Sequence, residues 1–193
     1  MAAGARQRAA RGLVAAVAVA VAVVLVSAAP AAAQPMPTGR ISIQTGGKAA
    51  TGAFASRIGL GLGAGLEAAY QPLRPDQSIG LGLTASTTWS YYFAGSARVA
   101  DAMSILEMGI GARARVPLGA RRRQVLFLGG GAALVRFNEP PVLAGDRSYL
   151  GPWATAGIEG VVLGIQIGIE ARYVLARSDD GTIGLLLSVG TGS

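Results

Sequence analysis

The chain has 193 residues, with 17 Lys or Arg against 10 Asp or Glu, and it contains neither His nor Cys. Catalytic triads with His, His-bound metals, thiolate chemistry, disulfides and zinc ribbons are therefore excluded. Charged residues make up 14% of the chain, against roughly 25% in soluble domains. With 29 Gly and a mean hydropathy of +0.46, the composition indicates a membrane or secreted protein rather than a disordered one.

The N-terminus has the three parts of a secretory signal peptide. Arg6, Arg8 and Arg11 form a basic region, the run from Leu13 to Val26 is apolar, and Ala31–Ala33 supply small residues for cleavage. The alternative is a membrane anchor, but the apolar run is shorter than the roughly 20 residues of a spanning helix. We predict a cleaved signal peptide over residues 1–33 and one mature domain over residues 34–193. Its removal takes away only three arginines and lowers the net charge from +7 to +4. No dense basic run with interleaved aromatic residues points to nucleic acid.

From residue 40 onward the dominant period of the sequence is two, which is the period of β-strands. In residues 57–70, Ile58, Leu60 and Leu62 fall on one face, while Gly59 and Gly61 fall on the other. Many of these segments approach the roughly 9–11 residues with which a strand crosses a bilayer. The pattern predicts eight strands, over about 40–46, 57–70, 78–93, 102–116, 124–137, 149–163, 165–176 and 182–190.

The connections between these strands alternate in length. One set spans 71–77, 117–123 and 163–164, whereas the other spans 47–56, 94–101, 138–148 and 178–181 and is longer on average. Short turns at one end and longer loops at the other are typical of transmembrane barrels with a periplasmic short-turn end. The sequence thus predicts an all-β fold, an eight-stranded antiparallel up-and-down transmembrane β-barrel.

The charged residues of the strands fall on one face when each strand is phased by its apolar residues. This placement has a physical cause, because an Arg or Lys facing lipid at mid-depth costs about 2–4 kcal/mol. A soluble barrel would show the opposite sense, with its charges toward water. The residues assigned to the small or polar face are Arg57, Glu67, Glu107, Arg113, Arg115, Arg136, Glu159, Glu170 and Arg172.

Aromatic residues lie near the ends of several predicted strands, as in the two interfacial girdles of membrane barrels. We expect one girdle to contain Trp89, Tyr91, Phe93, Phe137 and Tyr173, and the other to contain Tyr70 and Phe127. Tyr149 and Trp153 are instead predicted on the inner face near the longer loops, where they plug or fill the barrel mouth.

The mature chain resembles the small outer-membrane β-barrel family of the eight-stranded OmpA/OmpX-like kind. The residues that carry the resemblance are the signal peptide, the alternation Gly59-Leu60-Gly61-Leu62-Gly63 and the turn entry Tyr70-Gln71-Pro72. The resemblance implies outer-membrane lipid and the outer-membrane assembly machinery as partners. Members commonly end on an aromatic residue that this machinery reads, whereas this chain ends Ser188-Val189-Gly190-Thr191-Gly192-Ser193.

Motifs for catalysis or for cofactors are scarce, and we predict no catalytic, cofactor or metal residues. The glycines at 59–65 do not form a dinucleotide motif, and Gly46-Gly47-Lys48 lacks the spacing of a phosphate loop. Asp179-Asp180-Gly181 is typical of a turn, and Arg121-Arg122-Arg123 is typical of a solvated turn.

The inward charges have two interpretations. In the first they pair inside a packed barrel, because an eight-stranded interior is just wide enough for side chains to fill. In the second they line a narrow path for ions. We favour a structural or surface-interaction protein that is not an enzyme, with an unknown surface partner. The alternatives are a small pore and a soluble periplasmic or secreted barrel that binds an apolar ligand. The predicted interior network contains Glu67, Glu107, Arg113, Arg115, Glu159, Glu170 and Arg172.

Overall fold

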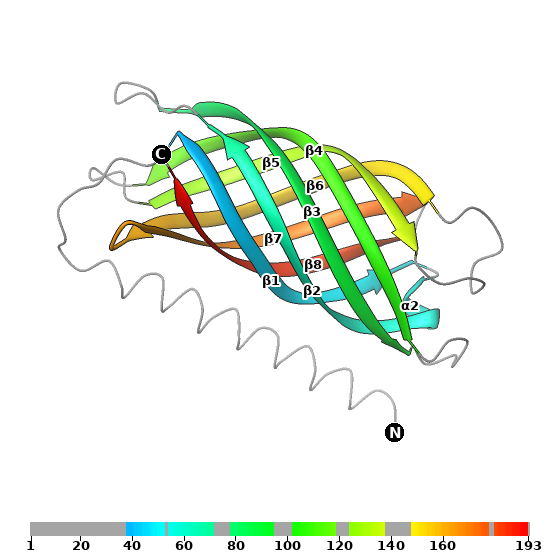
Figure 1. The fold of residues 1–193 in the computed structure, drawn as a ribbon. Coiled ribbons are helices and arrows are strands. Elements are labelled where there is room, and N and C mark those ends of the chain that lie inside the picture. Colours follow the sequence, from blue (N-terminus) through cyan, green and yellow to red (C-terminus); the bar gives the residue numbers. More distant parts are fainter. Residues whose placement is uncertain are drawn as a thin grey trace. The chain divides into compact units, whose positions relative to one another are not determined.

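A computed structural model describes residues 38–52, 54–71, 78–94, 102–118, 124–137, 148–177 and 180–192. Within these residues the strands form one closed antiparallel barrel, in which each strand pairs with the next and β8 pairs with β1 (Figure 1). The predicted eight-stranded up-and-down barrel is confirmed. Its elements are β1 (Gly39–Thr51), α2 (Phe54–Arg57), β2 (Ile58–Tyr70), β3 (Gly80–Ala94), β4 (Ala102–Leu118), β5 (Gln124–Phe137), β6 (Ser148–Val162), β7 (Ile165–Arg177) and β8 (Asp180–Gly192).

The two ends of the barrel differ. The short-turn end carries the β2–β3, β4–β5 and β6–β7 connections together with the first residues of β1, which pair with the last of β8. There Leu163 and Gly164 have φ angles of 52° and 80°, as a two-residue hairpin turn with both residues at positive φ requires. The turn sets Gly157 opposite Glu170, and Glu159 opposite Gly168. The loop end carries the remaining connections, including α2. No helix in the described part of the chain is long and apolar enough to cross a membrane.

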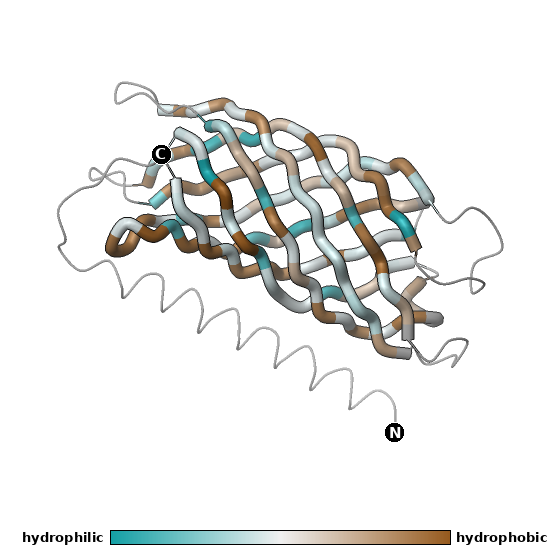
Figure 2. Tube along the Cα trace, in the orientation of Figure 1, coloured by the Kyte–Doolittle hydropathy of each residue, from teal (hydrophilic) through white to brown (hydrophobic). Residues whose placement is uncertain are grey.

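Hydrophobic and hydrophilic residues alternate along many of the strands (Figure 2), and buried and exposed side chains alternate with them. In β2 the outward residues Leu60, Leu62 and Leu66 are 59%, 64% and 53% exposed, whereas Glu67 is buried. Inward glycines make room for rings: a Cβ at Gly61 would lie 2.8 Å from the Tyr92 ring. The exterior is thus apolar and the interior polar over much of its length.

The start of β2 and the end of β1 differ from the predicted strands. β1 continues to Thr51 rather than ending at residue 46, because it pairs with both β2 and β8 as far as Ala49. Arg57 belongs to α2 and not to a strand. Ile58 was assigned to the outer face but is buried, because the β2–β3 register shifts between Ile58 and Gly61. This irregularity turns the first residue of β2 inward.

The inner and outer faces of β5 also differ from the prediction. Arg136 was assigned to the inner face, but it points outward and is exposed, on the same face as Leu126 and Leu128. Phe127 and Phe137 were assigned to the girdles, and both are buried inside the barrel. β5 carries apolar residues on both faces, so its hydrophobic pattern does not reveal which face is inside. Trp89, Tyr91, Phe93, Tyr70 and Tyr173 do point outward, as expected.

Candidate functional site: the barrel interior

The interior holds an unusual number of buried charges. Long side chains from most strands point inward because the alternation of each strand places them there, and the narrow barrel keeps them from water. All seven residues of the predicted network are among these buried ionisable groups, together with two further cations. The set is Arg40, Lys48, Glu67, Glu107, Arg113, Arg115, Glu159, Glu170 and Arg172.

Glu67 on β2 is the centre of the network. Its carboxylate accepts hydrogen bonds from Arg113 Nη2 at 2.8 Å, from Arg172 Nη2 at 3.0 Å and from Arg40. Gln44 Nε2 donates to the same carboxylate at 3.2 Å. Three guanidinium groups from β1, β4 and β7 therefore converge on one carboxylate, which links strands that do not pair with one another.

Two further carboxylates complete this group of charges. Glu170 accepts from Arg172 Nε at 2.6 Å and from Arg113 Nη2 at 3.0 Å. Glu159 lies 2.7 Å from Arg115 Nη2 and accepts a hydrogen bond from Arg40. The pair of carboxylates on β6 and β7 is thus surrounded by cations that reach in from β1 and β4.

A separate ion pair lies closer to the loop end. Lys48 Nζ is 2.5 Å from Glu107 Oε2, and Thr182 Oγ1 donates to Oε1 of the same carboxylate at 2.8 Å. Both charged side chains are almost fully buried. This pair joins β1 to β4 across the barrel.

Two aromatic rings cover arginines of the network. The Arg113 guanidinium lies 4.1 Å from the centre of the Phe127 ring, and that of Arg172 lies 5.4 Å from the Trp153 ring. Trp153 Nε1 donates to the backbone oxygen of Ile110 at 3.1 Å. Cation–π contacts of this kind are worth about 0.5–2 kcal/mol, and more when water is excluded.

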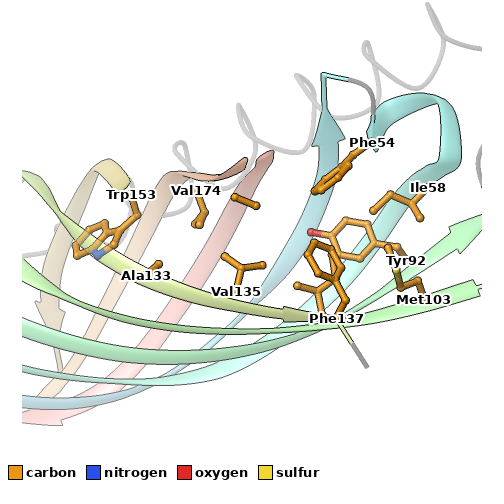
Figure 3. Close-up of a cluster of buried hydrophobic side chains, with 11 residues drawn as sticks. Phe54, Ile58, Tyr92, Met103, Ala133, Val135, Phe137, Trp153 and Val174 are labelled. Atoms are coloured by element: carbon orange, nitrogen blue, oxygen red, sulfur yellow. The ribbon is translucent and has the colours of Figure 1, made fainter. Parts of the chain in front are cut away.

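An apolar cluster fills the loop end of the interior (Figure 3). Phe54 of α2 enters the mouth of the barrel, where its ring meets that of Phe137 at 5.4 Å. The Phe54 backbone N–H donates to Asp180 Oδ1 at 3.3 Å, which attaches the helical turn to the start of β8. Trp153 is part of this cluster and Tyr149 packs against it, so both fill the mouth. The buried members are Phe54, Ile58, Tyr92, Met103, Ile105, Ala133, Val135, Phe137, Trp153, Val174 and Ala176.

Sequence reasoning missed Arg40, Gln44 and Lys48 as parts of the network. Their signal is the alternation of β1, in which Arg40, Ser42, Gln44 and Lys48 share the face opposite Ile41. The prediction ended this strand at residue 46, so it treated Lys48 as a loop residue. The predictions for residues 1–33, for Arg121–Arg123 and for Asp179 concern residues outside the described ranges.

The arrangement can cross-link the barrel walls and neutralise most of the buried charge. Each of the four buried glutamates in the described part of the chain contacts at least one Lys or Arg. The chain has no His to act with these groups as a base or a metal ligand. Polar groups occupy the short-turn end and the centre, and apolar groups occupy the loop end.

The fold is similar to solved outer-membrane barrels. Neisserial surface protein A aligns with a TM-score of 0.54 at 14% identity, over 83% of this chain and 100% of that chain. The outer membrane enzyme PagL gives 0.49 at 14% identity, over 80% and 99%, and Ail of Yersinia pestis gives 0.48 at 15% identity, over 79% and 97%. Comparisons with protein-family models and with curated protein sequences give no match. The chain therefore has the fold of the small eight-stranded outer-membrane β-barrels.

Proposed function

We propose that this protein is an integral outer-membrane β-barrel with a structural or surface-interaction role and no enzymatic activity. In this proposal residues 1–33 are a signal peptide removed on export. The observation that carries the proposal is the polarity of the barrel, which is apolar outside and charged inside.

The exterior would be unfavourable in water. Leu81, Leu83 and Ile110 are 71%, 67% and 68% exposed, and they belong to a band of outward Leu, Ile and Val on most strands. Burying such a side chain is worth about 1.5–3 kcal/mol, so a band of this kind favours a lipid environment. Patches larger than a few hundred Å² are rare on soluble monomers.

The interior supports a structural role rather than conduction. An ion crossing the barrel would have to pass the apolar cluster at the loop end, where Phe54, Tyr92 and Phe137 meet. It would also have to separate guanidinium and carboxylate groups that contact each other directly. A filled interior is what an eight-stranded barrel is expected to have.

The absence of catalytic activity is proposed from the chemistry of the side chains. The chain lacks His, and each interior carboxylate is engaged by a cation instead of being directed at an open cleft. A surface partner would be met by the connections of the loop end. Outer-membrane lipid and the assembly machinery are the other partners in this proposal.

Cell fractionation tests the location. The full chain, expressed in a Gram-negative host, should be recovered in the outer-membrane fraction and released only by detergent, with Gln34 as its first residue. Recovery in the soluble periplasmic fraction without detergent would contradict the proposal and favour a soluble barrel that binds an apolar ligand. A soluble periplasmic protein and a known outer-membrane protein serve as markers in the same preparation.

Planar-bilayer recording tests the alternative of a small pore. Purified protein should insert without discrete conductance steps. A matched variant, Phe54→Ala, removes the ring that enters the mouth and shows whether the assay detects a less filled barrel. Reproducible steps from the unmodified protein would replace the structural role with a pore.

A further inference from the structure

The hairpin that joins β6 to β7 extends beyond the strands on either side of it. Within the described residues, the β5–β6 ladder ends at Gln124–Gly160 and the β7–β8 ladder ends at Gln166–Gly190. The described pairings of residues 161–165 are therefore all within the hairpin. Figure 1 shows their turn, in orange, projecting past the neighbouring strand ends. We call residues 161–165 the β6–β7 tip.

The β6–β7 tip is apolar throughout. Its sequence is Val161-Val162-Leu163-Gly164-Ile165, and Figure 2 shows this turn as hydrophobic. Leu163 is 87% exposed and Ile165 is 45% exposed. The other two short connections, over 71–77 and 117–123, each contain charged residues. Of the three turns at this end, the β6–β7 turn is thus the one whose sequence does not favour water.

The backbone of Leu163 makes the choice of leucine unfavourable within the chain itself. Leu163 has a φ angle of 52° and Gly164 one of 80°. A turn of this kind favours Asn-Gly, because Asn adopts the left-handed region more readily than a residue such as Leu does. Leu163 is almost fully exposed, so packing within the chain does not offset this strain. Whatever favours leucine here lies outside the chain.

The apolar surface of the tip is continuous with the lipid-facing exterior of the barrel. On the face of β6 opposite Glu159, apolar cross-strand pairs lead from the turn into the wall. No charged or polar side chain interrupts this series, whereas a protein–protein interface typically has a polar rim. The pairs are Val162–Ile165, Gly160–Ile167 and Ile158–Ile169.

We propose that the β6–β7 tip inserts among the acyl chains of the leaflet at the short-turn end, so that membrane lipid covers Leu163 and Ile165. This inference rests on the proposed membrane location and adds a specific lipid-contacting element to it. Transfer of the leucine side chain from water into lipid supplies the stabilisation that the strained turn lacks within the chain. The charged connections of the same end stay in water.

Fluorescent labels at single cysteines test the depth of the tip. The chain has no Cys, so Leu163→Cys provides one attachment site. The labelled protein is folded into phosphatidylcholine vesicles, with or without bromine on the acyl chains. Bromine should quench the label at Leu163→Cys, and aqueous iodide should not. Leu62→Cys on the outer face of β2 is the control for lipid, and Asp76→Cys in a charged connection is the control for water.

The controls separate the failure of this inference from the failure of the proposed location. Lipid quenching at Leu62→Cys together with iodide quenching at Leu163→Cys would overturn the insertion of the tip but leave the membrane location intact. Iodide quenching at both positions would contradict the location itself. A Leu163→Cys label that neither quencher reaches would indicate that a second copy of the chain covers the tip, which also overturns insertion into lipid.

Leu163→Asn gives a second test, because a turn in water and a turn in lipid predict opposite signs. Asn fits the positive φ angle better but loses the transfer of an apolar side chain. In phosphatidylcholine vesicles it should lower the ratio of folded to unfolded protein about tenfold. Leu163→Met, which stays apolar, should keep the ratio of the unmodified protein. An unchanged or higher ratio for Leu163→Asn would mean that the turn lies in water.

Discussion

Replacing Glu67 with Gln removes the charge at the centre of the network while it keeps the shape of the side chain. Three arginines lose an anionic partner, but each retains another, because Arg113 and Arg172 still contact Glu170 and Arg40 still contacts Glu159. The expected loss is therefore that of one broken buried pair, about 3–5 kcal/mol, and not three times that value.

The measurement is urea unfolding of the mature protein in phospholipid vesicles, followed by the fluorescence of Trp89 and Trp153. Arg136→Gln is the control, because Arg136 is an exposed charge on the outer face of β5. Arg136 is the penultimate residue of β5, and an outward Arg near the membrane interface changes stability by only about 0–1 kcal/mol. If Glu67→Gln and Arg136→Gln lower the free energy of unfolding equally, the carboxylate is hydrated and screened. The reasoning from a sealed network would then be refuted.

Three other substitutions test other parts of the barrel by the same unfolding assay. Gly61→Ala should destabilise the barrel, because the new Cβ atom would lie 2.8 Å from the ring of Tyr92. Gly47→Ala should be neutral or slightly stabilising, because no atom lies within 4 Å of a Cβ atom at that position. Equal effects of the two variants would contradict the packing of Tyr92 against Gly61. Leu62→Arg should cost about 2–4 kcal/mol in bilayers, while Leu62→Phe should not, and a tolerated Arg would mean that this face does not meet lipid. Glu107→Gln should lower the free energy of unfolding, because it leaves the buried ammonium of Lys48 without its carboxylate. Adding Lys48→Met should restore much of that loss. A double variant as unstable as Glu107→Gln alone would refute the isolated Lys48–Glu107 pair.

The sequence alone was enough to predict the architecture. Alternation with a period of two separates Leu60, Leu62 and Leu66 from the glycines and Glu67 of β2, and the cost of a charge in lipid then decides which face is outside. Burial of the seven charges named from the sequence follows from the same alternation. The register between β6 and β7 could also be predicted from the sequence, because a two-residue turn allows only one register.

Three local features depended on neighbouring strands. β1 extends through Gly46-Gly47 to Lys48 because β2 and β8 both pair with it, although two adjacent glycines read as a loop in isolation. Ile58 turns inward at an irregularity in the β2–β3 ladder. In β5 both faces are apolar, so only closure of the barrel decides that Phe127 is inside and Arg136 outside.

The partners within the network were decided by tertiary structure alone. Arg40 and Glu159 are 119 residues apart in sequence, and they meet because the strands tilt and the barrel closes β8 onto β1. Alternation predicts whether a side chain points inward or outward. It does not predict the position of the side chain along the barrel axis, or which side chain it meets across the interior.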